Sequence, residues 1–121
     1  MYRLMIVDDS TIIRNRIQRI YNADEFMLVT TATNGIEAIE QFDLHRPNVI
    51  TMDLTMPHMD GIDCIPTIMA KDPSVRILVI SALSDKATGL RALKLGARGF
   101  LIKPFSEEEL ADALNEIVSD E

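Results

Sequence analysis

Short apolar runs alternate with amphipathic stretches along this chain, and the alternation repeats five times. The expected strands span residues 3–7, 27–33, 48–52, 76–81 and 99–102, and runs such as LMIV and RILVI are almost uninterrupted. Such runs are typical of strands that are buried on both faces of a parallel sheet. The expected helices between and after them span residues 10–21, 34–45, 61–71, 85–95 and 106–118.

Strict alternation of strands and helices, joined by right-handed crossovers, gives an open parallel sheet with helices on both faces. We therefore predict an α/β fold with a flavodoxin-like, doubly wound sheet of five strands in the order 2-1-3-4-5, and five helices. The 121 residues contain no linker, repeat or low-complexity segment, so a single domain over residues 1–121 is expected.

Local signals refine the expected helices. Ser10 is a good N-cap for the first helix, and Ser106 with Glu109 forms an S-x-x-E capping box for the last. Pro66 lies inside the third helix and lacks an N–H donor, which predicts either a kink there or a late start with Pro66 in the first turn. The apolar positions of the second helix are Ile36, Ile39 and Phe42, and those of the fourth are Leu90, Leu93 and Ala97.

Composition excludes several classes of protein. The chain is 47% hydrophobic, too much for a disordered protein, and no apolar run approaches the roughly 18 residues that a membrane span needs. The N-terminus has the pattern of neither a signal nor a transit peptide. A net charge of −7 argues against direct nucleic-acid binding. The single cysteine, Cys64, can form neither an internal disulfide nor a zinc site, so the cytoplasm is the expected compartment.

Polar residues follow four of the five expected strands. Asp8 and Asp9 follow the first, Asp53 the third, Ser81 ends the fourth and Lys103 follows the fifth. Each could be a helix cap or a solvated strand end if taken alone. The carboxyl ends of the strands meet at one edge of such a sheet, where ligands bind. Two carboxylates about 4 Å apart repel by roughly 1 to 4 kcal/mol. The cluster therefore needs a cation, a shared proton or the lysine ammonium to offset its charge.

Aspartates with carbonyl and water oxygens form the ligand set that Mg²⁺ prefers, and Mn²⁺ is an alternative. A nearby lysine and a serine hydroxyl would suit phosphoryl oxygens as a charge and a hydrogen-bond donor. These residue types indicate metal-assisted phosphoryl transfer onto one of the carboxylates. Asp53 is the best candidate because it stands alone on the central strand, facing the Asp8–Asp9 pair.

The segments IVDDS, MDLTMPHMDG, ISAL and KPF, in this order and spacing, resemble the receiver domain of two-component response regulators, above all its single-domain CheY-like members. The resemblance implies that Asp53 accepts a phosphoryl group from a histidine kinase or a phosphotransfer protein. It also implies that Asp53, Asp9, Asp8 (through water) and the backbone carbonyl of Thr55 hold Mg²⁺.

Further site residues follow from the same resemblance. Ser81 and Lys103 match the residues that contact the phosphoryl group, and the Lys103–Pro104 peptide is expected to be cis. Phe100 matches an aromatic switch residue, although the chemotaxis protein that gives the type its name has tyrosine there. Leu83 borders the site and is expected to hinder an attacking water. Thr55 replaces that protein's asparagine, which leaves the lifetime of the phosphoaspartate open.

The implied function is a phosphorylation-activated switch in a phosphorelay. Phosphorylation would change the surface of the fourth helix, fifth strand and fifth helix, and so the binding of a downstream protein. Such a protein promotes only its own phosphotransfer and dephosphorylation and is not otherwise an enzyme. It would be a monomer or a phosphorylation-dependent dimer, and chemotaxis is one candidate pathway.

Three alternatives remain at this point. The first is a receiver cut from a longer regulator with a DNA-binding or enzymatic output domain. A haloacid dehalogenase-type phosphatase also forms a phosphoaspartate, but it needs a second aspartate where this chain has Thr55. A pseudo-receiver that is never phosphorylated is disfavoured, because Asp8, Asp9, Asp53, Ser81 and Lys103 are all present.

Overall fold

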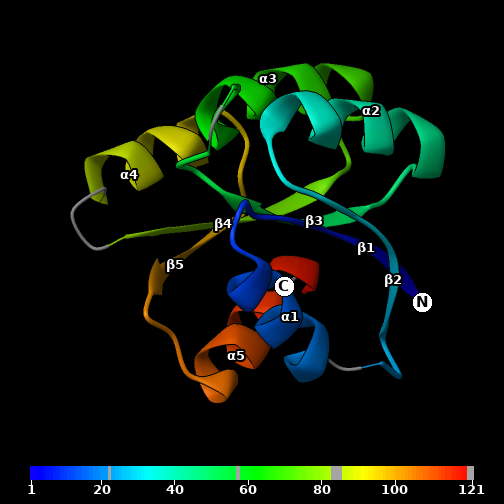
Figure 1. The fold of residues 1–121 in the computed structure, drawn as a ribbon, viewed down its shortest axis with the longest axis vertical. Helices are drawn as coiled ribbons and strands as arrows, with labels where there is room; N and C mark the ends of the chain where they lie inside the picture. Colours follow the sequence, from blue (N-terminus) through cyan, green and yellow to red (C-terminus); the bar gives the residue numbers. More distant parts are fainter. Residues whose placement is uncertain (22, 57, 83–85, 120–121) are drawn as a thin grey trace.

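The computed structural model describes residues 1–21, 23–56, 58–82 and 86–119, and shows a five-stranded parallel sheet flanked by helices (Figure 1). The strands are β1 Tyr2–Val7, β2 Phe26–Ala32, β3 Val49–Asp53, β4 Arg76–Ala82 and β5 Gly99–Lys103. The helices are α1 Thr11–Ile20, α2 Gly35–His45, α3 Gly61–Lys71, α4 Lys86–Lys94 and α5 Glu107–Val118. The strand order β2-β1-β3-β4-β5 confirms the predicted flavodoxin-like topology.

An apolar core layer packs on each face of the sheet. Helices α2, α3 and α4 cover one face and α1 and α5 the other (Figure 1). Within β1, Met5 and Val7 pack into the layer under α2–α4, whereas Leu4 and Ile6 pack into the layer under α1 and α5. The other inner strands alternate in the same way, which explains why their sequences are almost continuously apolar. No helix in the described ranges is long and apolar enough to cross a membrane.

Most element boundaries lie within one residue of their predicted positions. β3 and β5 each extend one residue further than predicted, because Asp53 pairs with Ile80 and Lys103 with Ala82 in the parallel ladders. The strand predicted at residues 27–33 lies one residue earlier, at Phe26–Ala32. Thr33 leaves the ladder because its N–H donates to the Glu37 carboxylate at 3.1 Å.

The predicted helix caps are present. The Ser10 hydroxyl accepts a hydrogen bond from the N–H of Ile13 at the start of α1. Ser106 and Glu109 form the reciprocal capping box of α5. The predicted late start of the third helix is wrong: α3 begins at Gly61, is capped by the Asp60 side chain and continues through Pro66. Pro66 is exposed, so its ring lies on the outer side of α3 and does not disturb the packing of the helix against the sheet.

The apolar face that the sequence indicated for the fourth helix is only partly correct. Leu90 and Leu93 are exposed (56% and 37%), and the buried positions of α4 and the turn after it are Gly89, Ala92 and Ala97. A similar shift occurs in α2, where Ile36 is 49% exposed while Gly35 and Ala38 are buried. Phe42 is buried as predicted, and glycines lie on the buried side of both helices, at Gly35 and Gly89, where the backbone approaches its neighbours closely.

One buried hydroxyl in the core yields a stability prediction. Thr51 in β3 is 1% exposed, and its side-chain oxygen has no hydrogen-bond partner within the described part of the chain. Thr51→Val should raise the free energy of unfolding by about 1 kcal/mol, because an unsatisfied buried polar group is removed and its shape is kept. Urea denaturation would measure the change. Thr30→Val is the matched control and should destabilise, because the Thr30 hydroxyl is 2.6 Å from Gln41 Oε1. A loss of stability in Thr51→Val would contradict the prediction.

Candidate functional site

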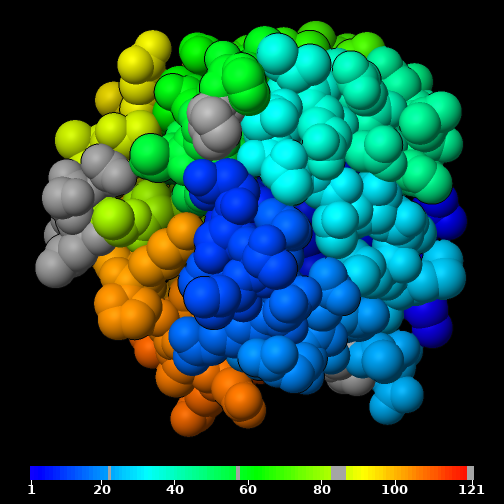
Figure 2. All heavy atoms as spheres, viewed as in Figure 1, coloured from blue at the N-terminus to red at the C-terminus, as the bar shows by residue number. Residues whose placement is uncertain are grey.

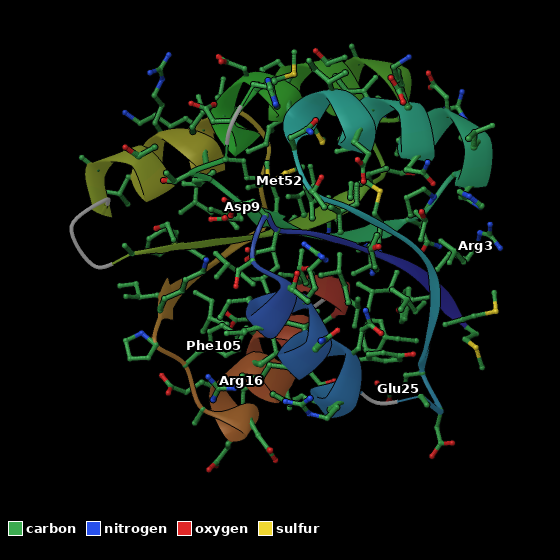
Figure 3. The ribbon with its side chains drawn as sticks, in the orientation of Figure 1. Arg3, Asp9, Arg16, Glu25, Met52 and Phe105 are labelled. Carbon is green, nitrogen blue, oxygen red and sulfur yellow. The ribbon has the colours of Figure 1, made fainter. Side chains whose placement is uncertain are left out.

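The ends of β1, β3 and β5 bring three acids and a lysine together. Carboxylate oxygens of Asp8, Asp9 and Asp53 all lie within 4.8 Å of one another. The Lys103 Nζ atom is 3.2 Å from Asp8 Oδ2 and 3.5 Å from Asp53 Oδ1. Asp8 is 1% and Asp53 4% exposed, whereas Asp9 is exposed. Asp9 is labelled at the end of β1 in Figure 3.

The surrounding surface is formed by segments that are distant in the sequence. In Figure 2 the start of α1 (blue) lies on the same face as green residues that follow β3 and orange residues that follow β5. Strand order reverses between the neighbours β1 and β3. β2 lies beside β1 on one side of this pair, and β4 and β5 lie beyond β3 on the other. The acids thus lie where ligands bind in sheets of this kind.

Asp8 is fixed by contacts from the first turn of α1. Its Oδ1 accepts a hydrogen bond from the N–H of Ser10 at 2.9 Å, and its backbone carbonyl accepts one from Arg14 Nη1 at 2.7 Å. The N–H of Asp8 donates to the carbonyl of Ala32 at 3.0 Å. The Asp8 carboxylate therefore keeps one orientation toward Asp53, although the two charges repel.

Asp53 is held by the loop that follows it. Its Oδ1 accepts a hydrogen bond from the N–H of Thr55 at 3.3 Å. The loop then returns so closely that a Cβ on Gly61 would lie 2.4 Å from the backbone oxygen of Asp53. Only glycine fits at this position, and its N–H donates to the carbonyl of Leu54 at 3.1 Å. The Asp60–Gly61 pair therefore sets both the start of α3 and the loop beside the acids.

The pKa of Asp53 is raised from 3.8 to about 7. Burial is the largest cause, since it disfavours the charged form, and the negative charge of Asp8 adds to it. The positive charge of Lys103 and the Thr55 N–H act in the opposite direction, and a hydrogen bond with the Asp9 carboxyl raises the pKa further. In the absence of a cation, the negative charge of the cluster is thus offset partly by a proton on Asp53 and partly by the Lys103 ammonium.

The donor set suits a hard divalent cation. Three carboxylates within 4.8 Å offer only oxygen ligands, which Mg²⁺ and Mn²⁺ prefer, and the cluster could bind such a metal. Asp9 is exposed, so the cluster is open to solvent on one side, where the remaining ligands would be waters. A soft-metal site is not indicated, because the Cys64 thiol is buried in the core and burial raises its pKa to about 12.

The structure does not bring all predicted site residues into contact. The Ser81 hydroxyl is buried and lies 3.3 Å from the carbonyl oxygen of Ala82, to which it donates; within the described residues it has no hydrogen bond to Asp53. Ser81 lies opposite Ile102 in the ladder, so it shares a face with Phe100 rather than with Lys103. The Lys103–Pro104 peptide is cis, as predicted.

The remaining residues differ in how they relate to the acids. The Phe100 ring packs against Gly89 of α4, and the side chain of Pro104 is exposed. Thr55 is exposed and follows Asp53 by two residues. The predicted site residue Leu83 lies outside the described residues. The sequence did not indicate Arg14 as a site residue, because a basic residue in a helix is most simply explained as solvated. It indicated residue 61 only as the start of the third helix, not as a glycine packed against Asp53.

Comparison with known proteins agrees with this architecture. Residues 4–115 match the sequence model of the response regulator receiver domain. The chain is 40% identical to the chemotaxis protein CheY of Listeria monocytogenes, over 94% of this chain and 96% of that protein. It is 40% identical to CheY of Thermotoga maritima, over 95% of this chain and 96% of that one.

A solved structure gives the same result for the fold. The crystal structure of the CheX–CheY–BeF₃–Mg²⁺ complex from Borrelia burgdorferi contains a chain that superposes with a TM-score of 0.91 at 30% identity. The superposition covers 98% of this chain and 90% of that one. The sequence match, the shared topology and the acidic pocket agree, and the chain belongs to the family of response regulator receiver domains, with a CheY-like domain over nearly its whole length.

Proposed function

We propose that this protein is a phosphorylation-activated signalling switch that accepts a phosphoryl group on Asp53 from a histidine kinase or a phosphotransfer protein. The observation that carries the proposal is the position of Lys103, whose ammonium lies between two buried carboxylates, Asp8 and Asp53, at the end of the central strand. The CheY relatives are named for chemotaxis, so we propose chemotactic signalling in the cytoplasm as its pathway.

In the proposed reaction an Asp53 carboxylate oxygen attacks phosphorus, and a new oxygen–phosphorus bond forms. The bond from phosphorus to the donor's imidazole nitrogen breaks, and the nitrogen keeps the electron pair. Asp53 must be ionised to attack, and with a pKa of about 7 its carboxyl carries a proton in a large fraction of metal-free molecules near neutral pH. A bound cation would favour the ionised form. The Lys103 ammonium stabilises the ionised form and can then bond a phosphoryl oxygen.

The residues that would hold Mg²⁺ are Asp8, Asp9, Asp53 and the carbonyl of Thr55, and the bound ion would supply positive charge to the transferred oxygens. The Borrelia burgdorferi CheY was crystallised with BeF₃ and Mg²⁺, which supports the same cofactor here. We propose no further enzymatic activity beyond the protein's own phosphotransfer and dephosphorylation.

The added phosphoryl group brings roughly 1.5 to 2 negative charges and three acceptor oxygens. We propose that Ser81 exchanges its bond to the Ala82 carbonyl for a phosphoryl oxygen, and that Phe100 responds on the same face of the sheet. The surface of α4, β5 and α5 would then bind a downstream protein. The complex of a related CheY with CheX supports a protein partner.

The proposal predicts a single site of phosphorylation. Incubation with a small phosphodonor and Mg²⁺ should add one phosphoryl group to the wild-type protein, measured by intact-protein mass spectrometry. Asp53→Asn should remove the labelling, because an amide is not a nucleophile for phosphorus. Asp63→Asn is the matched control, since Asp63 is exposed on α3, and it should label like the wild type. Equal labelling of Asp53→Asn and the wild type would refute the assignment.

A further inference from the structure

An arginine of α1 holds the turn that follows β5. The Arg16 guanidinium donates a hydrogen bond to the backbone carbonyl of Phe105, and its carbon lies 4.9 Å from the centre of the Phe105 ring. Phe105 is 2% exposed, so its ring and carbonyl are both fixed in the layer between α1 and α5. Figure 3 labels Arg16 and Phe105 close together where α1 meets the connection from β5 to α5.

This turn directly follows Lys103, which ends β5. β5 is an edge strand of the sheet and has a hydrogen-bonded neighbour on one side only, β4. The last paired residue of β5 is Lys103 itself, opposite Ala82. Beyond it the ladder no longer restrains the backbone, and the contact with Arg16 is made two residues later, at Phe105. Arg16 thus restrains the chain at the point where the sheet ceases to do so.

The restraint matters because the Lys103 ammonium has to lie close to both Asp8 and Asp53. Its ammonium lies 3.2 Å from Asp8 and 3.5 Å from Asp53, at the end of a flexible four-carbon side chain. Because this side chain is flexible, the position of the backbone at Lys103 influences which of its conformers bring the ammonium between the two carboxylates. Arg16 is suited to fix a turn, because its planar fork stacks on an aromatic ring and donates a charge-assisted hydrogen bond at the same time.

We propose that Arg16 is a positioning residue for phosphoryl transfer: by fixing Phe105 it keeps the Lys103 ammonium between Asp8 and Asp53. Arg16 touches none of the reacting groups and acts only through Lys103. The inference rests on the proposed function, in which Asp53 is the phosphoacceptor and Lys103 supports it. A purely structural role, the packing of α1 against α5, is the alternative that the experiment must separate.

The test is a double-mutant cycle on the rate of Asp53 labelling by a small phosphodonor with Mg²⁺. Arg16→Ala should slow labelling about 10-fold in the wild-type background, as expected for a misplaced charge at a reacting centre. In a Lys103→Ala background the same substitution should change the rate less than about twofold, because the group through which Arg16 acts is already missing. Arg19→Ala is the matched control: it removes the same charge from an exposed position on α1 and should leave the rate unchanged.

A second measurement does not depend on activity. In the metal-free protein, the NMR signal of the methylene next to the Lys103 ammonium should shift in Arg16→Ala and stay in place in Arg19→Ala. Arg16→Lys keeps the cation but loses the planar fork, so its rate should lie between those of the wild type and Arg16→Ala. If Arg16→Ala does not fold, Arg16→Lys and Arg16→Gln, which keep a donor for the Phe105 carbonyl, take its place in the cycle.

The outcomes separate this inference from the proposed function. If the wild type takes no phosphoryl group on Asp53, both are wrong. If the wild type is labelled and Arg16→Ala is labelled equally fast, only the role of Arg16 is wrong. Equal slowing by Arg16→Ala in the presence and absence of Lys103 would also overturn it, because that result indicates a structural role independent of the lysine.

Discussion

Asp53→Asn is expected to make the metal-free protein more stable than the wild type at pH 8. The pKa of Asp53 is raised from 3.8 to about 7 in the folded protein, mainly by burial and by the charge of Asp8. A carboxyl with a raised pKa binds its proton more tightly in the folded state than in the unfolded one. The contribution of Asp53 to wild-type stability should therefore be fully present below about pH 4 and be lost as the pH rises through about 7.

The asparagine variant lacks this pH-dependent loss. The free energy of unfolding of Asp53→Asn should exceed that of the wild type only slightly near pH 4. The difference should reach about 2 to 4 kcal/mol at pH 8, the size expected for a shift of about three pKa units. Urea denaturation in the presence of a chelator would measure both proteins across this range. Asp112→Asn removes one exposed charge from α5 and should change stability by less than about 0.5 kcal/mol throughout.

Mg²⁺ should reduce or reverse the difference in stability between Asp53→Asn and the wild type, because it stabilises the cluster only when Asp53 is ionised. Its stabilising effect on the wild type should grow between pH 6 and 8, as the proton leaves Asp53. An advantage of Asp53→Asn that is equal at pH 4 and pH 8 would show that the variant acts through packing and not through the charge.

Much of the architecture could be predicted from local patterns. Continuous apolar runs such as Ile77–Ile80 indicate strands buried on both faces, and their alternation with helices leaves few topologies. The five polar positions at the strand ends then predicted one site, and the structure brings Asp8, Asp9, Asp53 and Lys103 together as expected. This works because one edge of a parallel sheet collects the end of every strand.

What the sequence could not provide depends on contacts between distant segments. Nothing near Arg14 or Arg16 in the chain indicates that their guanidinium groups reach the carbonyls of Asp8 and Phe105. Periodicity also placed Leu90 and Leu93 on the buried side of the fourth helix, because apolar residues normally mark that side. There the packing selects the smallest residue instead, and Gly89 faces the sheet.

The contact between Gly89 and Phe100 predicts that Gly89→Ala destabilises the wild-type protein but stabilises a variant without the Phe100 ring. A Cβ on Gly89 would lie 1.8 Å from Cε2 of the Phe100 ring and 2.4 Å from two of its other ring atoms. Gly89→Ala should therefore force the half-buried ring out of its present position. The loss of ring burial, about 2 kcal/mol, should exceed the gain of about 1 kcal/mol in helix propensity and leave the variant about 1 kcal/mol less stable.

In a Phe100→Ala background the ring is absent, so only the gain in helix propensity remains. There Gly89→Ala should stabilise the protein by about 1 kcal/mol, as measured by urea denaturation. The reversal of sign identifies the ring as the group that requires glycine in α4, since a contact with any other neighbour would persist in both backgrounds. A stabilising effect of Gly89→Ala in the wild-type background would mean that α4 can move away from β5 at little cost. In that case Gly89 would not determine the position of Phe100.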